Sequence, residues 1–504
     1  MSHTTNRQTD PSLDSGPIAP NGQVRDEWDQ AKLRRRMLEG CWRNDLNAVL
    51  DDEFDLNRRK GLGVTSTTKN LAKSTISQLA VIYDREPIVG HADDEEGSST
   101  VRGVLDDAGL WQLAQSFSQK VIGMREAAYR VDIHQDEGQE PFLQVTIIPR
   151  DLFHVEADAN TPDVPHTVYH YRLRQRDPDA NGNVPDAEWT RDCISIRDPA
   201  NPVYTIQAAT ADGEKPKDLS GVSFGGAVLG DKSGDNYPAQ WRWADGTPFI
   251  PFALYHAIRT GKLTDSFTGI ELFDGSLAVS ALLQLWKHLI RDASAPQRGT
   301  MDANYVGNKT IGPDGGANAS VDFGAILNFQ STSPGRAGRE FQWDPGGDPK
   351  AMLDSIQSYA ADIVVDFDVF PADIARTHTD ARSGHAIEIS RDGQRSAQRR
   401  YEPSFRRGDV EVCAKAAAMW NRQTDSTIPE TGWTVVYPGL PLSMQEMKLK
   451  LEDYKLRREL GATSLPVLVA MLEGITEDEA RKRLEQFQQD NARFAGPAAP
   501  PRFG

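Results

Sequence analysis

The chain has 504 residues, and its 56 Lys and Arg stand against 73 Asp and Glu, so its formal net charge is −17 and it does not coat nucleic acid through its overall charge. Its 3 Cys lie far apart without a Cys or His partner at ligand spacing, which argues against a disulfide framework and a structural zinc site. No apolar run reaches the roughly 18 residues of a membrane span, and residues 1–25 lack the apolar core of a signal peptide, so we expect a soluble protein in a reducing cytoplasm, with no membrane partner.

The first half of the chain changes from a helical to a strand pattern. Apolar residues recur at intervals of three and four over 26–40, 67–83 and 104–121, which predicts helices. Alternation with a period of two then predicts strands over 129–133, 142–148, 167–173, 193–197, 203–207 and 249–255. The acidic composition of 151–245 favours a solvated, mostly antiparallel sheet. The ends, 1–25 and 495–504, are predicted to be disordered tails.

Two strongly apolar helices bracket a Gly- and Asn-rich segment. The first is expected to begin with Asp274 as its N-cap and to end within 291–296. The second opens with Asp348 as cap and Pro349 in its first turn, a favoured combination. The segment between them, 297–347, is predicted to be a small, separate β-rich module.

The last third of the chain is mostly helical. A long helical pattern covers 383–422, and Gly393, Pro403 and Gly408 should kink or break it. A strand over 433–437 is followed by three predicted helices, the first and last of which open with capping boxes. These helices are 443–460, 465–473 and 476–490, and we expect them to form a C-terminal bundle.

Charges form two patterns. Asp354, Ser358, Asp362 and Asp366 follow one another at intervals of four, with no basic partner at that spacing, although like charges there cost a few tenths of a kcal/mol. A solvated helix face is the simplest interpretation, and the alternative is a surface that repels a polyanion. Residues 376–422 contain ten basic and six acidic residues, which suits pairing with neighbouring subunits or with phosphate.

Catalytic motifs match only in part. Residues 221–225 read Gly-x-Ser-x-Gly, but their flanks suit neither the strand nor the helix of a nucleophile elbow. The segments 61–69 and 307–310 each lack a glycine that a phosphate loop needs. His378 and His385 have acidic neighbours but no metal-ligand spacing. We therefore expect no enzyme activity, no cofactor and no metal.

The order of these elements, together with several short motifs, resembles the portal proteins of tailed bacteriophages over about 26–490. Each motif is weak alone, and their sequence order makes the match fairly specific. The residues that carry it are 79–87 (ending Tyr-Asp-Arg-Glu-Pro), 148–153, 171–174, 247–251, Ser383-Gly384-His385-Ala386, 460–464, 474–476 and 479–480.

The resemblance implies an α+β portal fold and a ring, usually of twelve copies, at one capsid vertex. Double-stranded DNA would pass through it during packaging and ejection, and the large terminase and then the head-tail adaptor would dock on it. The major capsid protein and any scaffold would be further partners. The protein would be located in the virion and, during assembly, in the host cytoplasm. The implied parts are a wing (26–273 and 383–440, which includes the long helix), two stem helices (274–296 and 348–368), a clip (297–347), a tunnel loop (369–382) and a crown (441–494).

Candidate site residues follow from these parts. The hypothesis is that Asp354, Asp362 and Asp366 line the channel, since a conduit should touch phosphates weakly and evenly. Tunnel-loop candidates for DNA contact are Pro371, Arg376, His378 and Arg382. Basic clip candidates for contact with a partner are Arg298, Lys309, Arg336 and Arg339.

Two other functional classes remain open on the sequence. A DNA-packaging or DNA-processing enzyme would need a phosphate loop or a carboxylate cluster on strand ends, and neither is found. Another virion component, such as an adaptor or a baseplate protein, would not need an apolar helical pair with a module between its arms. Assembly state and shape separate the three interpretations.

Overall fold

The structure is a computed structural model in which helices and strands are both abundant and largely segregated along the chain, so the fold is α+β. Strand pairs in its sheets are antiparallel, except for β11 with β12. The residues that the structure describes are 22–53, 69–135, 140–158, 164–174, 188–208, 223–224, 227–228, 237–258, 270–293, 297–302, 327–328, 338–343, 348–369, 371, 384–424, 426–440, 444–459, 464–473 and 477–494. The predicted tails therefore lie outside the described residues, except for 22–25.

Helices predominate in the first part of the chain that the structure describes. Their bounds are α2 (Gly22–Glu39), α3 (Arg43–Glu53), α5 (Leu71–Leu79), α6 (Glu95–Asp107) and α7 (Leu110–Met124). Sequence analysis predicted one helix over 104–121, which is wrong. The chain takes a left-handed conformation at Gly109, with φ +68°, and this residue separates α6 from α7 although the apolar periodicity runs on across it.

Two larger sheets follow these helices along the chain. β2 (Glu126–His134) lies between β3 (Phe142–Pro149) and β10 (Phe252–His256), and their positions agree with the predicted strands. The second sheet has the order β4-β5-β6-β7, all antiparallel, as the composition of 151–245 predicted. Its bounds are β4 (Phe153–Ala157), β5 (Pro165–Arg174), β6 (Glu188–Ser195) and β7 (Val203–Ala208), with the 3-10 turn η1 (Arg150–Leu152) before it. The short pair β8 (Ser223–Phe224) and β9 (Ala227–Val228) follows.

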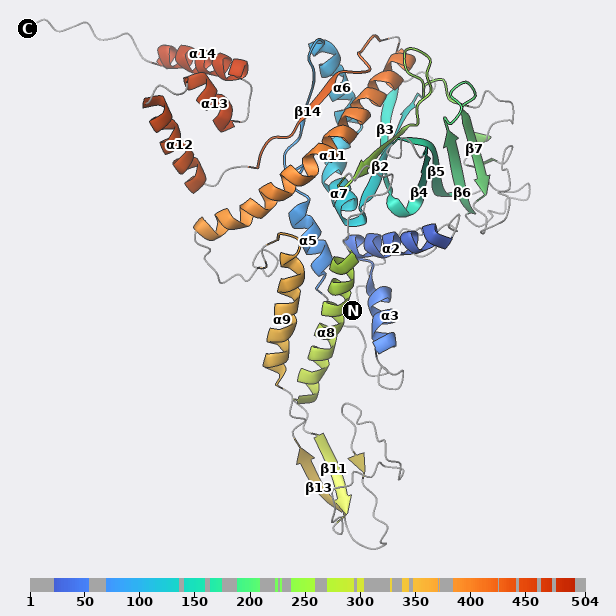
Figure 1. Ribbon diagram of the computed structural model, residues 1–504, viewed down its shortest axis with the longest axis vertical. Coiled ribbons are helices and arrows are strands. Elements are labelled where there is room, and N and C mark those ends of the chain that lie inside the picture. The colour runs from blue at the N-terminus through green and yellow to red at the C-terminus, as the bar shows by residue number, and fades with distance from the viewer. Residues whose placement is uncertain are drawn as a thin grey trace, which may run out of the picture.

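The later elements are arranged around a projecting helix pair (Figure 1). α8 (Ile270–Ala293) and α9 (Pro349–Val365) run side by side away from the sheets, and β11 (Gln297–Asp302) and β13 (Gly338–Trp343) lie beyond their far end, with β12 (Leu327–Asn328) paired to β11. α8 begins four residues before Asp274, so the predicted N-cap there is wrong, while its end agrees with the prediction.

The C-terminal part returns to the body. α11 (Gly384–Thr424) runs along it, and β14 (Trp433–Val436) pairs with β1 (Ile88–His91). The helices α12 (Met444–Glu459), α13 (Leu465–Glu473) and α14 (Glu477–Phe494) lie together apart from the sheets (Figure 1), close to their predicted bounds. No helix among the described residues is long and apolar enough to cross a membrane.

The long helix was predicted to be kinked or broken at Gly393, Pro403 and Gly408. It is not broken, because α11 is one helix of 41 residues that includes all three. Proline inside a helix removes a backbone hydrogen bond and costs about 3 kcal/mol. The flanking side chains Tyr401 and Phe405 are each fully buried, and such burial contributes roughly 1.5–3 kcal/mol per large side chain. Packing on both sides of Pro403 therefore offsets its cost.

A buried carboxylate lies in the core between α11 and the sheets. The hydroxyls of Tyr83, Tyr255 and Tyr437 all donate to Asp409, with the Tyr83 oxygen 2.8 Å and the Tyr255 oxygen 2.6 Å from Oδ1. Burial raises the pKa of Asp409 to about 6, although the three tyrosine hydrogen bonds act in the opposite direction. Phe405 packs edge-on against Tyr83 and Tyr255. The cluster joins four segments of the chain that are distant in sequence.

The preceding residue, Gly408, has no room for a side chain. A Cβ there would stand 2.5 Å from Cζ and 2.6 Å from Cδ1 of Tyr255, a ring held by its bond to Asp409 and by Phe117. We expect Gly408→Ala to lower the free energy of unfolding by about 1–3 kcal/mol in chemical denaturation, although alanine is the better helix former. The control is Gly103→Ala in α6, where nothing lies within 4 Å and we expect a gain of about 1 kcal/mol. Equal stability of the two variants would mean that the Tyr255 ring moves aside freely.

Candidate functional site

In the helix pair α8/α9, the start of α9 is fixed by a strong N-cap. Oδ1 of Asp348 accepts a hydrogen bond from the backbone N of Lys350 at 2.9 Å, and Pro349 follows in the first turn, as predicted. On the side that faces α8, Ile356 and Val364 are buried. The axes come close where α8 has Gly275, since a Cβ there would stand 2.7 Å from Cδ1 of Ile363. Small size at this point therefore lets the two helices pack.

The carboxylates of α9 lie on the side turned away from α8. Asp354, Ser358, Asp362 and Asp366, here called the acidic face, are all exposed. Asp362 lies six residues after the buried Ile356, which places it about 240° round the helix at about 100° per residue. Among the described residues, none of the three aspartates has an ion-pair partner. The acidic face thus presents unneutralised negative charge to solvent.

The end of α9 is fastened to α11. The backbone N of Asp366 donates to the carbonyl oxygen of Asp362 at 3.3 Å, and Asp368 then takes a left-handed conformation with φ +57°. Arg400 of α11 forms an ion pair with Asp368, and a Cβ on Gly393 would stand 2.7 Å from the Asp368 carbonyl oxygen. Gly393, one of the residues expected to kink or break α11, permits this close contact because it has no side chain. The last turn of the acidic face is therefore held at a defined position.

The first half of α8 is enclosed by its own chain. Oγ of Ser276 accepts from the backbone N of Ala72 at 3.1 Å, and Oγ of Ser280 donates to the carbonyl oxygen of Lys69 at 2.9 Å. Both serines are buried, and they join α8 to the start of α5, whose N-cap is Asn70. The segment of α8 was predicted to be a strongly apolar helix. Packing against α3, α5 and α9 accounts for part of this apolar character.

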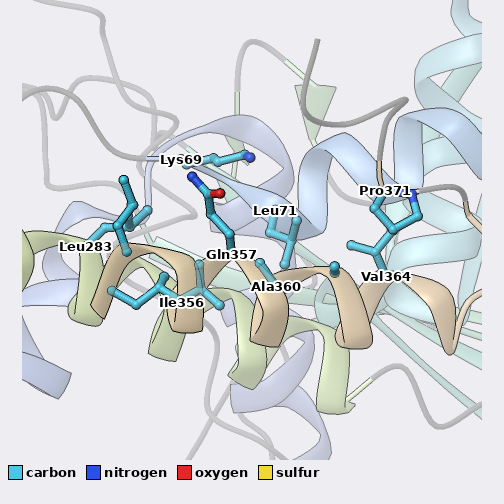
Figure 2. Close-up of a pocket in the computed structure, with 11 residues that line it drawn as sticks. Lys69, Leu71, Leu283, Ile356, Gln357, Ala360, Val364 and Pro371 are labelled. Atoms are coloured by element: carbon cyan, nitrogen blue, oxygen red, sulfur yellow. The ribbon is translucent and has the colours of Figure 1, made fainter. Parts of the chain in front are cut away.

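A hollow of about 320 Å³ lies on one flank of the pair, between α5, α8 and α9 (Figure 2). Its walls are mostly apolar, and Lys69 and Gln357 lie next to each other at one side of it. Apolar wall residues from the three helices are Leu71, Val279, Leu283, Ala360 and Val364, and Pro371 closes one end. This hollow is the place where the structure puts Pro371, which sequence analysis assigned to a loop that contacts DNA.

The remaining predicted residues are placed only in part. Arg376, His378, Arg382, Lys309 and Arg336 lie outside the described residues. Arg298 lies on β11 and pairs with Gln342, while Arg339 on β13 pairs with Met301.

Metal ligation has no candidate in the part of the chain that the structure describes, since no group of three or more His, Cys, Asp and Glu there could hold an ion. His378, and the acidic residues beside it at 373 and 380, lie outside that part. The hollow and the serine contacts of α8 were not predicted. The one available signal was weak: Gly275 and two serines interrupt an otherwise apolar helix.

Comparisons with known proteins give a distant structural likeness. No protein family model matches the chain, and no curated protein matches it. Among solved structures, a chain described as "Virion of native gene transfer agent (GTA) particle" is similar with a TM-score of 0.39 and 12% identity, over 83% of this chain and 92% of that chain. A likeness of this size leaves the function of the present chain to its own residues.

Proposed function

We propose that this chain is a portal protein, a subunit of a ring at one capsid vertex that forms the channel for double-stranded DNA. The observation that carries the proposal is the projecting pair α8/α9 with strands beyond its tip and an unneutralised acidic face along α9 (Figure 1). In a closed ring of such pairs, one face of every α9 can line a common channel. The protein is not an enzyme in this proposal.

The acidic face suits a conduit for a polyanion. Each Lys or Arg that meets a phosphate adds salt-dependent affinity, so a basic wall would slow DNA that has to slide. A carboxylate wall repels phosphates from all sides and keeps the duplex near the axis. Transient attraction would come from Arg376 and Arg382 in the segment after α9.

The other parts follow the portal plan. The sheets, the N-terminal helices and α11 form the wing, α8 and α9 the stem, residues 297–347 the clip, 369–382 the tunnel loop and α12–α14 the crown. The clip would bind the large terminase and later the head-tail adaptor, and the wing would meet the major capsid protein and any scaffold. The protein would act in the virion after assembly in the host cytoplasm.

Assembly state tests the proposal first. Twelve copies of 55.7 kDa have a mass of about 670 kDa, which light scattering after size exclusion would measure. We expect closed rings with a central hole in negative-stain electron micrographs, with scaffold protein added if the chain alone stays monomeric. A monomer that hydrolysed ATP or cut DNA would overturn the proposal in favour of an enzyme.

Removal of the negative charges tests the acidic face. In a ring of twelve, substituting Asp354, Asp362 and Asp366 by Asn removes about 36 charges from the channel wall. In rings that have assembled, we expect slower DNA translocation in a packaging assay, and a stronger dependence of its rate on salt, because phosphates then approach the wall more closely.

A charge-matched control separates channel effects from net charge. Asp93, Asp106 and Asp107 are exposed on or next to α6, away from α9, and their Asn variants change the net charge by the same amount. Translocation should be unaffected in this control. If both triple variants behave like the unmodified protein, the acidic face is only a solvated helix surface.

A further inference from the structure

The hollow is shaped to receive a side chain. Its volume of about 320 Å³ is roughly twice the ~150 Å³ of a cavity that takes up benzene, so it has room for a phenol ring and a smaller group. Leu71, Leu283 and Val364 supply apolar wall from three different helices (Figure 2). At the rim, the exposed Lys69 has no ion pair within the described part of the chain. An apolar side chain with acidic neighbours would complement this surface.

The opposite flank of the same pair carries such side chains. Met352 and Tyr359 of α9 are 43% and 45% exposed, and Leu282 of α8 is 38% exposed; these three are here called the apolar flank. Met352 and Tyr359 are seven residues apart and so lie on one side of the helix. Val364 in the hollow is five residues beyond Tyr359, about 140° round the axis. The protruding and the hollow surfaces therefore lie on different flanks of one element.

Charge and height also match. Asp362 and Asp366 follow Tyr359 by three and seven residues, which puts carboxylates beside the protruding ring and opposite the charge of Lys69. Copies related by rotation about an axis parallel to the stem stand at the same height. The apolar flank spans 352–359 on α9, and the wall of the hollow spans 353–364 on the same helix, so the two levels overlap.

We propose that the hollow of one copy receives Tyr359 and Met352 of a second copy of this chain, in a head-to-tail contact. A contact between two different surfaces repeats from copy to copy and ends in a closed ring or an open filament. Overlapping heights favour the ring. The inference deepens the portal proposal and rests on it only for ring closure, since the contact itself needs nothing but two copies.

Site-specific cross-linking tests the contact. Tyr359 is replaced in the full-length chain by p-benzoylphenylalanine, the protein is irradiated, and cross-linked peptides are identified by mass spectrometry. We expect covalently joined copies with the cross-link on α5, α8 or α9 residues that line the hollow. Val365 is the matched control, because it is 55% exposed on the same helix but lies six residues after Tyr359, about 120° round the axis, so the same probe there should not reach the hollow. Cross-links outside the hollow, or no joined copies, would overturn the inference.

Substitutions give a second, quantitative readout. Tyr359→Ala should raise the dissociation constant between copies at least tenfold, measured by light scattering over a dilution series, and Val365→Ala should change it less than twofold. Lys69→Asp should weaken assembly, and adding Asp362→Lys should restore it. Wild-type dissociation constants in all four variants would contradict the proposal.

The electron micrographs separate the two proposals. Closed rings whose cross-links lie outside the hollow would leave the portal proposal standing and remove this inference. Filaments or pairs of copies joined through the hollow would confirm the contact and count against the portal. Rings joined through the hollow would support both.

Discussion

Replacing Arg35 by Met should lower the free energy of unfolding by about 3–5 kcal/mol at pH 7, measured by chemical denaturation. Nη2 of Arg35 lies 3.1 Å from Oδ2 of Asp151, and the two side chains are only 2% and 4% exposed. Methionine fills much of the arginine volume but leaves the Asp151 carboxylate buried without its cation. The expected loss is mainly the cost of that uncompensated charge.

The pH dependence of this loss identifies its cause. Burial already raises the pKa of Asp151 even though Arg35 lowers it, so removing Arg35 should raise it further. When the pKa of a carboxyl is higher in the folded state than in the unfolded chain, the free energy of unfolding falls as pH rises. Protonation of the carboxyl at lower pH removes this loss of stability. The difference between Arg35→Met and wild type should therefore shrink at pH 5. A loss that stays constant with pH would indicate lost packing instead.

Two further variants complete the test. Arg35→Met combined with Asp151→Leu removes both charges, and we expect it to recover most of the stability. The surface pair Arg400–Asp368 serves as the matched control, since its side chains are 37% and 56% exposed and Arg400→Met should cost less than about 1 kcal/mol.

The buried pair has a structural role at the base of the stem. α2 lies across the junction between the sheets and the α8/α9 pair (Figure 1), and Arg35 binds it to η1. Its neighbour Arg34 stands over the ring of Phe273 in α8, 5.5 Å from the ring centre. One helix thus connects the body with the projecting pair, and loss of the ion pair should loosen both.

Local signals were predictable from the sequence because they act within a few residues. The cap at Asp348, the helix over 465–473 and the alternation in 167–173 depend on neighbours in the chain, and the structure confirms all three. Boundaries that depend on backbone conformation or on packing were less predictable. Gly109 ends a helix inside a continuous periodic pattern, and the burial of Tyr401 and Phe405 carries a helix through Pro403.

Composition also misled where charges are buried. Region 151–245 is acidic and was predicted to be solvated, yet its Asp192 is fully buried. Nη2 of Arg174 lies 2.7 Å from Oδ1 of Asp192, and Nη1 of Arg130 in another sheet lies 3.1 Å from its Oδ2. The net charge of a segment does not show which of its charged side chains are paired and buried, so it could not distinguish Asp192 from an exposed carboxylate.

Of the candidate site, the acidic face was predictable from the sequence and the hollow was not. The acidic face could be recognised from the sequence because its residues recur at intervals of four on one helix. The structure shows these residues exposed, as expected for a solvated helix face. The hollow forms only where Lys69, Leu283 and Val364 come together, and Lys69 is more than 200 residues from the other two in the sequence. No local pattern encodes that meeting, which follows from how α5 packs against the helix pair.

The stability of the wild-type protein relative to Asp409→Asn should fall by about 3 kcal/mol as pH rises from below 4 to above 6. The pKa of Asp409 is about 6 in the folded protein and 3.8 is its ordinary value. Between these values the folded state holds a proton that the unfolded chain has released, so the free energy of unfolding decreases with rising pH. Asparagine keeps the shape but cannot ionise, and roughly half of the change should appear between pH 5 and 7.5.

Taking the difference between the two proteins isolates this carboxyl. Groups elsewhere, such as His170, whose pKa burial lowers well below its usual value, contribute equally to both and cancel. The groups that face Asp409 do not titrate between pH 4 and 7.5. Burial and the negative charge of Asp409 raise the pKa values of Cys413, of the three tyrosines of the cluster and of the nearby Tyr129. The guanidinium of Arg406 lowers the pKa of Tyr437, but burial and the charge of Asp409 outweigh this effect.

A third variant tests whether the tyrosines set the position of the transition. Each hydroxyl that donates to Asp409 stabilises its charged form and lowers its pKa, so Tyr437→Phe should move the midpoint above 6. The ring stays, so its contact with Tyr83 is kept. A difference curve that is flat between pH 4 and 7 would mean that water reaches the carboxylate and that its burial between α11 and the sheets is incomplete.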